Sequence, residues 1–597
     1  MEKKKLWILT FEFAGIIKVG GLGEVPANQA KHLVDEYDVT VFIPSHGQIE
    51  RLKKTHDLEK LALKCSKLVD LTILEKGDHN ADCAISYYRY KIHDVNIILL
   101  SGENEITKKY LDDDLLYNPE TFSGKMLLYS IGMRYYINYL IKNQNFDLPD
   151  ILHMHDYHVV IPFLGMKQEL NITNMDLPSM ITIHLLTWPR YDLKFYRACG
   201  IDDSPINILL KDGKNKLTIK EIYYLCKNNP TKDNENKLPT VEKVGAVISD
   251  MVTTVSESYL QTDIIPNLGQ DLIEFKSDFV WDGCDWEYDE IREDVMNKFG
   301  SEIRRVLQIS EDKDITQRDM KKYLLTYKIG NLSQSPLINS KKVLEVINQI
   351  SNGNPFVKNG IIKGFDESGP LVIATGRISR QKGFETIFDA IPEVIKVIPT
   401  AKFLLLILPT EYSLDEIKLY SEFVKKYPHN LRIIFGVASE IFKIAHLAAN
   451  AYCALSRWEP FGIIALEAMA SKLPVIATKI GGLQESVIDI RDDPIRGTGM
   501  LIQKDNPHQF ANALITLFTL AEIDEKYKLS EFNGEMEISN QINKIPDEVI
   551  KAQALSDFNY YSKIKENCIK RVEANFRWKI VTKKLKRLYE KLYTLNG

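Results

Sequence analysis

Two glutamates and a pair of glycines within one short stretch form the clearest candidate for a ligand site. Glu459 lies in the polar loop SRWEPFG that follows the apolar run NAYCAL, and Glu467 lies in the helical segment IIALEAMA. A second apolar run, PVIAT, leads into the turn that contains Gly481 and Gly482. Strand, loop, helix, strand and turn in this order are typical of a parallel α/β sheet, whose ligands bind at the carboxyl ends of the strands.

The spacing of the two glutamates argues against acid–base hydrolysis. They are eight residues apart, which on a continuous helix would separate them by roughly 12 Å along the axis. Pro460 and Gly462 indicate instead that Glu459 projects from the loop while Glu467 lies on the helix. A hydrolytic pair of carboxylates lies closer together, so we expect a binding site rather than a glycosidase pair.

Three basic residues at the end of another predicted strand form a second candidate. Arg377, Arg380 and Lys382 lie between the apolar run PLVIAT and the predicted helix ETIFDAIPEVIKV. Bidentate guanidinium groups, a compact ammonium group and the positive end of a helix together suit a diphosphate. We therefore interpret this cluster as an anion site rather than as solvated surface charge.

A glycine-rich loop near the amino terminus is the third candidate. Lys18 is followed by Gly20, Gly21 and Gly23, between the strand LWILTFEF and a helix PANQAKHLVDEY with Pro26 in its first turn. Such glycines let backbone N–H groups approach a ligand at the positive end of a helix. The spacing is neither GxGxxG nor GxxxxGK[ST], so it indicates neither a dinucleotide fold nor a P-loop.

Histidines gather at the ends of two further predicted strands. ILHMH carries His153 and His155 and is followed by Asp156 and His158, and SMITIH ends on His184. No further carboxylate pair or histidine cluster completes a coordination set, so we expect no metal site. Asp156 and His184 are the candidate site residues, and a core histidine bonded to backbone is the alternative for His184.

Apolar runs that alternate with helical segments predict two doubly wound α/β lobes. The first lobe, residues 1–280, should contain about six or seven strands. The second lobe, residues 281–575, begins at the turn WDGCDW and includes a polar insertion at about 521–555. Residues 576–597 are typical of an amphipathic helix with a basic solvent face.

Composition indicates a globular cytoplasmic protein. A chain of 597 residues is too long for one ordinary core, and its net charge of −5 gives no reason to expect nucleic acid or an anionic membrane as a partner. Seven dispersed cysteines without a CxxC pair indicate reduced thiols. Glu12 interrupts the apolar start, which argues against a signal peptide, and no apolar run approaches the roughly 18 residues of a membrane helix.

With these motifs the chain resembles the glycogen and starch synthase family. KVGGLGEV is similar to that family's KxGGLGDV, HDY to HDW, and DMVTTVSESY to ADxVTTVSPxY. DGCD resembles the NGxD hinge, GRISRQKG resembles GRxxxQKG, and SRWEPFG followed by GGL continues the series. FRW is similar to the FSW that opens the family's last helix, and the matches run in order from residue 15 to 580.

The resemblance implies a GT-B fold, with two Rossmann-like lobes facing a cleft and a C-terminal helix crossing back to the first lobe. It implies retaining transfer of glucose from ADP- or UDP-glucose to the non-reducing end of an α-1,4-glucan, without a metal or other cofactor. The implied partners are the nucleotide-glucose donor and the α-glucan acceptor. The choice between ADP- and UDP-glucose and the formation of a homo-oligomer stay open.

The resemblance also assigns roles to residues. His184 would lie near the anomeric centre, Arg377 and Lys382 would neutralise the leaving diphosphate, and Glu459 would hold sugar hydroxyls. Lys18, with the backbone of Gly20 and Gly21, would assist from the first lobe. The other implied substrate-binding residues are Asp156, Phe461, Gly462, Glu467, Gly481, Gly482 and Leu483, with Glu467 on the donor ribose.

Departures from the family pattern leave two alternatives. Glu24 replaces the usual Asp, Asp282 replaces the hinge Asn, and HLLTW replaces the bacterial HNLAYQG after the second histidine strand. Because acceptor contacts come from that last segment, a retaining transferase acting on a small acceptor is the alternative enzyme. A non-catalytic glucan- or nucleotide-binding regulator is the alternative from another class, and the presence of all the implied catalytic residues disfavours it.

Overall fold

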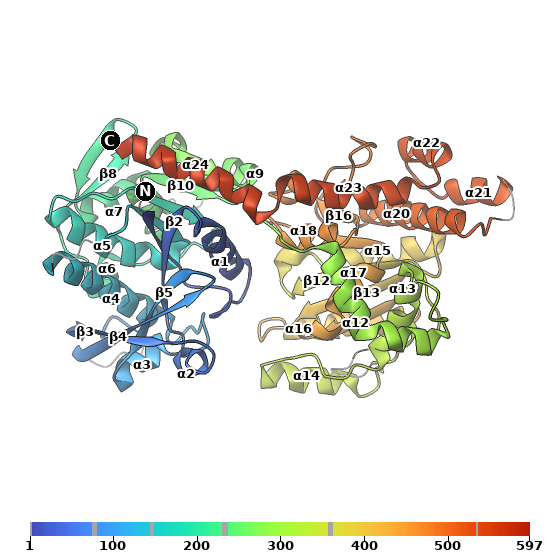
Figure 1. Cartoon of the computed structure of the whole chain (residues 1–597), viewed down its shortest axis with the longest axis horizontal. Coiled ribbons are helices and arrows are strands. Elements are labelled where there is room, and N and C mark those ends of the chain that lie inside the picture. Colours follow the sequence, from blue (N-terminus) through green and yellow to red (C-terminus); the bar gives the residue numbers. More distant parts are fainter. Residues whose placement is uncertain are drawn as a thin grey trace. The chain divides into compact units, whose positions relative to one another are not determined.

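The computed structural model describes residues 3–74, 80–143, 148–229, 237–355, 357, 362–532 and 535–596. The chain divides into two compact α/β units (Figure 1). The first unit comprises Met1–Asp282 together with Trp578–Gly597, and the second comprises Gly283–Arg577.

The first unit is built on a nine-stranded sheet with the order β11-β10-β7-β6-β1-β2-β5-β4-β3. All neighbours from β11 to β5 are parallel, whereas β4 and β3 are antiparallel additions. The strands are β1 (Lys4–Leu9), β2 (Tyr37–Pro44), β3 (Glu59–Asp70), β4 (Asn80–Ile92), β5 (Val95–Gly102), β6 (Ile151–His155), β7 (Ser179–Ile183), β10 (Met251–Thr254) and β11 (Ser277–Phe279). A separate hairpin joins β8 (Ile206–Leu210) and β9 (Gly213–Leu217).

The prediction of six or seven strands was wrong, because it omitted the antiparallel pair. Strand β3 is the edge of the sheet, and half of its twelve residues are both polar and exposed. An edge strand buries only part of one face, so its hydrophobic pattern is weak and charged side chains are favoured on it.

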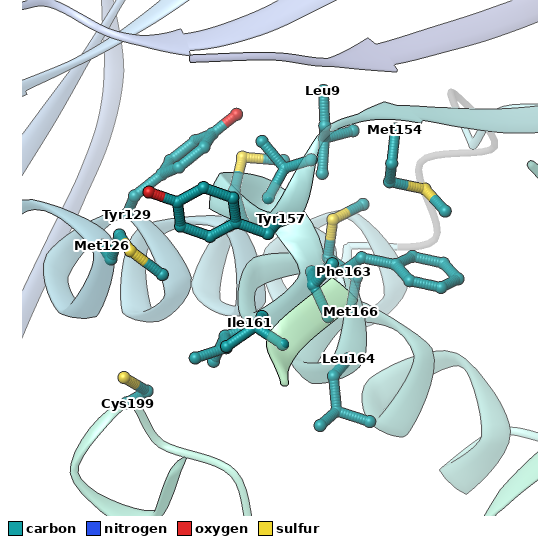
Figure 2. Close-up of a cluster of buried hydrophobic side chains, with 14 of the residues drawn as sticks. Leu9, Met126, Tyr129, Met154, Tyr157, Ile161, Phe163, Leu164, Met166 and Cys199 are labelled. Atoms are coloured by element: carbon teal, nitrogen blue, oxygen red, sulfur yellow. The ribbon is translucent and has the colours of Figure 1, made fainter. Parts of the chain in front are cut away.

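Helices cover the sheet of the first unit. Helices α4 and α5 pack together and contribute Met126, Tyr129, Ile161, Phe163 and Met166 to a buried cluster that Leu9 and Met154 reach from the sheet (Figure 2). Helix α24 packs against α1, although the two lie at opposite ends of the sequence (Figure 1). The main helices are α1 (Gly21–Leu33), α3 (Glu105–Leu111), α4 (Phe122–Lys142), α5 (Val160–Ile172), α6 (Leu193–Ala198), α7 (Ile219–Asn228), α8 (Val241–Ile248) and α24 (Trp578–Asn596).

Helix α1 begins at Gly21, which places Pro26 inside the helix and makes the prediction of Pro26 in its first turn wrong. Glycines are poor helix formers, so the sequence favoured a longer loop. Tertiary packing overrides this preference: a methyl group at Gly23 would lie 2.5 Å from the Cβ of Lys18. Only glycine allows the loop to lie this close to the first turn.

The second unit contains a six-stranded parallel sheet with the order β14-β13-β12-β15-β16-β17. The strands are β12 (Leu371–Arg377), β13 (Lys402–Leu408), β14 (Leu431–Phe435), β15 (Ala451–Ala454), β16 (Val475–Thr478) and β17 (Gly499–Ile502). The helices are α12 (Tyr288–Leu307), α13 (Gln317–Thr326), α14 (Lys341–Ser351), α15 (Glu385–Val397), α16 (Leu414–Lys426), α17 (Ser439–Ala448), α18 (Ile463–Ala470), α19 (Leu483–Ser486), α20 (Pro507–Lys528), α21 (Glu535–Ile542), α22 (Glu548–Ser556) and α23 (Tyr560–Asn575).

The polar stretch at about 521–555 is integrated into the second unit. Its first residues continue α20, where Ala521 and Ile523 are buried. Helices α21 and α22 follow, and their residues Ile542 and Ile550 join the same hydrophobic core. The polarity of this stretch therefore reflects the outer faces of helices that also have a buried face.

Two further features concern the whole chain. All seven cysteines are buried and unpaired. None of the helices within the described ranges is long and apolar enough to cross a bilayer.

Candidate functional site

In the second unit, the predicted anion and glutamate segments lie beside the point where the sheet reverses its strand order. Strand β12 is flanked by β13 on one side and by β15 on the other. The loops after β12 and β15 therefore leave the sheet in opposite directions, and the crevice between them is where open α/β sheets bind ligands. Arg377 ends β12, Lys382 follows in the next turn, and Glu459 lies in the loop after β15.

Lys382 and Glu459 form the polar centre of this crevice. The Lys382 Nζ lies 2.5 Å from the Glu459 Oε2, and the Ser456 hydroxyl donates to the same oxygen at 2.9 Å. Only 19% of the Lys382 side chain and 12% of the Glu459 side chain are exposed. The pair brings together two residues 77 positions apart, so an ammonium group and a carboxylate from distant segments lie side by side.

Glycine is required at three positions around Glu459. Gly462 has φ 99° and Gly481 has φ 41°, in the region that favours glycine. A methyl group at Gly481 would lie 1.8 Å from the carbonyl oxygen of Glu459, and one at Gly482 would lie 2.4 Å from the Cα of Phe461. The turn after β16 therefore packs directly against the Glu459 loop and sets its position.

Two arginines of the loop after β12 have no side-chain partner among the described residues. Arg377 and Arg380 are exposed, and the described part of the chain provides neither side chain with a hydrogen bond or an ion pair. Arg457, in contrast, is bound by Glu385 and Asp505. Arg377 and Arg380 are therefore the guanidinium groups available to an anion.

The other predicted residues of the second unit fall into two groups. The side chains of Phe461 and Leu483 are buried in the core, so a ligand could reach only their backbone atoms. The amide of Gly482 donates to the carbonyl of Pro460 at 3.1 Å and is therefore not free for a phosphate. Glu467 is half-buried on α18 and Glu459 projects from the loop, which confirms the predicted placement of the two glutamates.

In the first unit, the sheet reverses its strand order between β1 and β6. The glycine-rich loop follows β1, and its Lys18 forms an ion pair with Glu24. The amides of Val19 and Gly20 donate to the Oε2 of Glu12, at 2.6 and 3.3 Å. Glu12 is buried, so its carboxylate binds the loop from the protein interior. The Gly20 amide already donates to this carboxylate and is not free for a ligand.

Asp156 and His184 meet at the ends of β6 and β7. The amide of His184 donates to the Asp156 Oδ1 at 2.7 Å, and the His184 Nε2 lies 2.9 Å from the His155 Nδ1. Burial raises the pKa of Asp156 to about 8, while hydrogen bonds from the amides of His184 and Leu185 oppose this rise. Burial lowers the pKa of His184 to about 3, so its ring is neutral near pH 7.

His153 and His158 lie at the same edge of the sheet and are buried, and they contact different residues. His153 bonds to the Tyr589 hydroxyl and the Thr182 hydroxyl, both at 2.7 Å. His158 stacks on Phe11, with 4.9 Å between the ring centroids. Among the residues that the structure describes, no three His, Cys, Asp or Glu side chains are grouped to hold a metal ion.

Three functional candidates were missed from the sequence: Glu12, Glu242 and Tyr259. Glu12 had been considered only as an interruption of an apolar run, and its contact with the glycine-rich loop depends on the loop's fold. Glu242 and Tyr259 bind backbone amides of the loop after His184. Tyr259 ends the motif DMVTTVSESY, which was the one signal for it. Glu242 is a single acidic residue inside a helical segment, and its type and position give no local sign of this contact.

The chain matches two family models in succession. Residues 5–274 match the starch synthase catalytic domain, and residues 359–530 match the glycosyl transferases group 1. The glycogen synthase of Mycoplasma mobile is 24% identical over 360 residues, which cover 60% of this chain and 63% of that protein. The glycogen synthase of Geotalea daltonii is 23% identical over 521 residues, which cover 85% of this chain and 90% of that protein.

A solved structure shares the fold over nearly the whole chain. The catalytic domain of starch synthase IV from Arabidopsis thaliana, bound to ADP and acarbose, superposes with a TM-score of 0.63 at 17% identity and covers 99% of this chain and 100% of that one. Together with the two largely parallel sheets and the two family models, this likeness defines a glycosyltransferase of the GT-B fold. Within this class, the chain is similar to the glycogen and starch synthases.

Proposed function

We propose that the protein transfers glucose, with retention of configuration, from ADP- or UDP-glucose to the non-reducing end of an α-1,4-glucan. The observation that carries the proposal is the Lys382–Glu459 pair in the crevice between β12 and β15. The names of the relatives and the ADP and acarbose in the plant starch synthase structure support the same reaction.

The residues of the second unit suit the donor. Arg377 and Lys382 would bind the diphosphate and neutralise the charge that develops on it as the glucosyl bond breaks. Glu459 would accept hydrogen bonds from sugar hydroxyls, in a loop held by Gly481. Because the ammonium of Lys382 already lies on Glu459, binding of a diphosphate would compete with Glu459 for this cation and release carboxylate oxygens for the sugar.

The residues of the first unit suit the reacting sugar. His184 is neutral and oriented by His155, so it can exchange hydrogen bonds with hydroxyls without adding charge. Asp156 fixes the backbone from which His184 projects. Lys18, in the glycine-rich loop, is the cation that this unit would offer to a substrate.

The test offers the purified full chain ADP-glucose and UDP-glucose, each with and without glycogen, and measures elongation of the glucan. Lys382→Ala and Glu459→Ala should each lower the rate of transfer by about 100-fold or more, because groups that stabilise transition-state charge act at this scale. Lys472→Ala removes another lysine–glutamate pair of the same unit, with Glu566 at 2.6 Å, and should retain activity.

Two outcomes would contradict the proposal. Transfer to a monosaccharide or another small acceptor, with glycogen unchanged, would identify the alternative transferase. Binding of glucan or nucleotide without any turnover would identify a non-catalytic binding protein.

A further inference from the structure

The loop that follows β7, residues 184–188, is held at successive backbone amides by buried side chains. The amide of His184 donates to the Asp156 carboxylate at 2.7 Å. The amide of Leu186 donates to the hydroxyl of Tyr259 at 2.9 Å. Buried backbone N–H groups need a hydrogen-bond partner, and in this loop side chains from distant segments provide it.

Glu242 holds the second half of the same loop. Its Oε1 accepts hydrogen bonds from the amides of Thr187 and Trp188, at 3.0 and 2.9 Å, and from the Thr187 hydroxyl at 3.2 Å. Glu242 lies on α8 and is fully buried. Its second oxygen, Oε2, is also buried and has no hydrogen-bond partner in the described part of the chain.

The backbone is strained at Asp156, which binds the start of this loop, and at Trp188, which ends it. Asp156 has φ 62° and ψ 177°, a conformation otherwise found almost only in glycine. Trp188 has φ 64°, which is an outlier for a bulky side chain. Strained residues persist only where their surroundings determine them fully, and they concentrate at functional sites.

The burial of Glu242 is costly for the fold. A buried carboxylate requires hydrogen bonds to offset its lost hydration, and burial raises the pKa of Glu242. An apolar residue would fill this position of α8 without that cost. Its hydrogen bonds fix the backbone conformation of Thr187 and Trp188.

We propose that Glu242 is a positioning residue for glucosyl transfer, which sets the backbone of residues 184–188 so that the loop presents its groups to the acceptor sugar. Tyr259 acts with it on Leu186. The inference rests on the proposed function, because the loop gains its role only if sugar is transferred beside His184. It also explains how a loop that departs from the bacterial sequence pattern is kept in one conformation.

Kinetics with three variants test the proposal. Glu242→Ala should lower kcat/KM for glycogen by about 100-fold, the scale expected for misplaced binding groups. The affinity for ADP and UDP should stay unchanged, because Glu242 bonds to Thr187 and Trp188, which are not assigned to the nucleotide. Glu242→Gln keeps an oxygen that can accept both amides and should restore transfer to within about threefold of the wild type. Glu169→Ala removes a partner of Arg134 in the same unit, and its transfer rate per folded molecule should be normal.

Amide hydrogen exchange gives a readout that does not depend on activity. Thr187 and Trp188 should exchange faster in Glu242→Ala but keep their protection in Glu242→Gln, and Leu186 should exchange faster in Tyr259→Phe. Tyr259→Phe keeps the ring in place, so it provides the test if Glu242→Ala fails to fold.

Three outcomes would overturn the proposal: unchanged exchange at these amides, a Gln variant as inactive as the Ala variant, or faster exchange with normal transfer to glycogen. Absence of transfer by the wild-type protein would refute the proposed function instead, and the exchange pattern would still report on the loop.

Discussion

At the scale of single residues, buried ionisable groups distinguish the edge of the first sheet from an ordinary strand edge. Burial raises the pKa of Asp156 and lowers the pKa of His155 and His184. All three groups therefore favour their neutral forms, and their interactions are hydrogen bonds rather than ion pairs. Neutral groups of this kind can form hydrogen bonds with hydroxyl groups without a counter-ion.

The shift at Asp156 predicts a pH-dependent stability. Its folded pKa of about 8 lies above the ordinary 3.8, so its contribution to stability is full below about 3.8 and is lost as pH rises through about 8. Asp156→Asn removes this titration while keeping a side-chain acceptor. The melting temperature of the wild type should therefore fall relative to Asp156→Asn between about pH 5 and pH 9. A constant difference over that range would contradict the raised pKa.

Replacement of Gly481 should displace the loop that carries Glu459. Its positive φ and the 1.8 Å approach of a methyl group to Glu459 mean that Gly481→Ala must displace the Glu459 loop. We expect a loss of about 2 kcal/mol or more in unfolding free energy, together with loss of transfer.

Gly300 provides the matched control for Gly481. It lies inside α12, where the nearest atom to an added methyl group is 3.9 Å away. Gly300→Ala should therefore be neutral or stabilising by up to about 1 kcal/mol, because alanine favours a helix. Equal effects of the two substitutions in denaturant titrations would refute the close contact at Gly481.

At the scale of elements, helix α24 completes the first unit from the other end of the chain. Its Tyr589 is buried and bonds to His153, which bonds in turn to Thr182 on β7. The ring of His153 also lies 4.3 Å from that of His155, the partner of His184. The helix therefore supports the strands that carry the site, and not only the hydrophobic core.

Two tyrosines of α24 predict opposite results when each is changed to phenylalanine. Tyr589→Phe leaves a nitrogen of buried His153 without a partner and should cost about 1–3 kcal/mol of unfolding free energy. The hydroxyl of Tyr593 is buried without a partner among the described residues, so Tyr593→Phe should be neutral or slightly stabilising. Urea unfolding of both variants checks the difference, and equal costs would show that the bond to His153 contributes nothing.

At the scale of the whole molecule, the first unit consists of two separate segments of chain, residues 1–282 and 578–597. Six apolar or aromatic side chains of the second segment are buried: Trp578, Val581, Leu585, Leu588, Tyr589 and Leu592. Each such side chain contributes about 1.5–3 kcal/mol when fully buried. The stability of the first unit therefore depends on the last residues of the chain.

Removal of residues 578–597 should destabilise the first unit selectively. Hydrogen exchange should rise across β1, β6 and β7, while β12 to β16 keep their protection, because the second unit has its own core. The second unit serves as the internal control. Equal loss of protection in both units, or none in either, would contradict this division.

Local patterns were sufficient to predict most elements and the two-unit α/β organisation. The predicted segments KFLLLIL and ETIFDAIPEVIKV coincide with β13 and α15. A fully apolar run and a helical period are patterns of nearby residues, so both can be recognised in the sequence. Glycine and proline likewise indicated the turns around Glu459. The antiparallel pair β3 and β4 and the start of α1 were missed, since strand pairing and close packing are not local properties.

The sequence by itself determined the fold class and a set of candidate residues at strand ends, because residue type and spacing decide which segments form parallel strands and where those strands stop. Only the tertiary structure decided which of these residues meet. It paired Lys382 with Glu459 across 77 positions, placed Glu12 beneath the glycine-rich loop, and brought Asp156, Glu242 and Tyr259 to one loop. The physical reason is that hydrogen bonds and ion pairs between distant segments depend on the packing of whole elements, which no local pattern of residues contains.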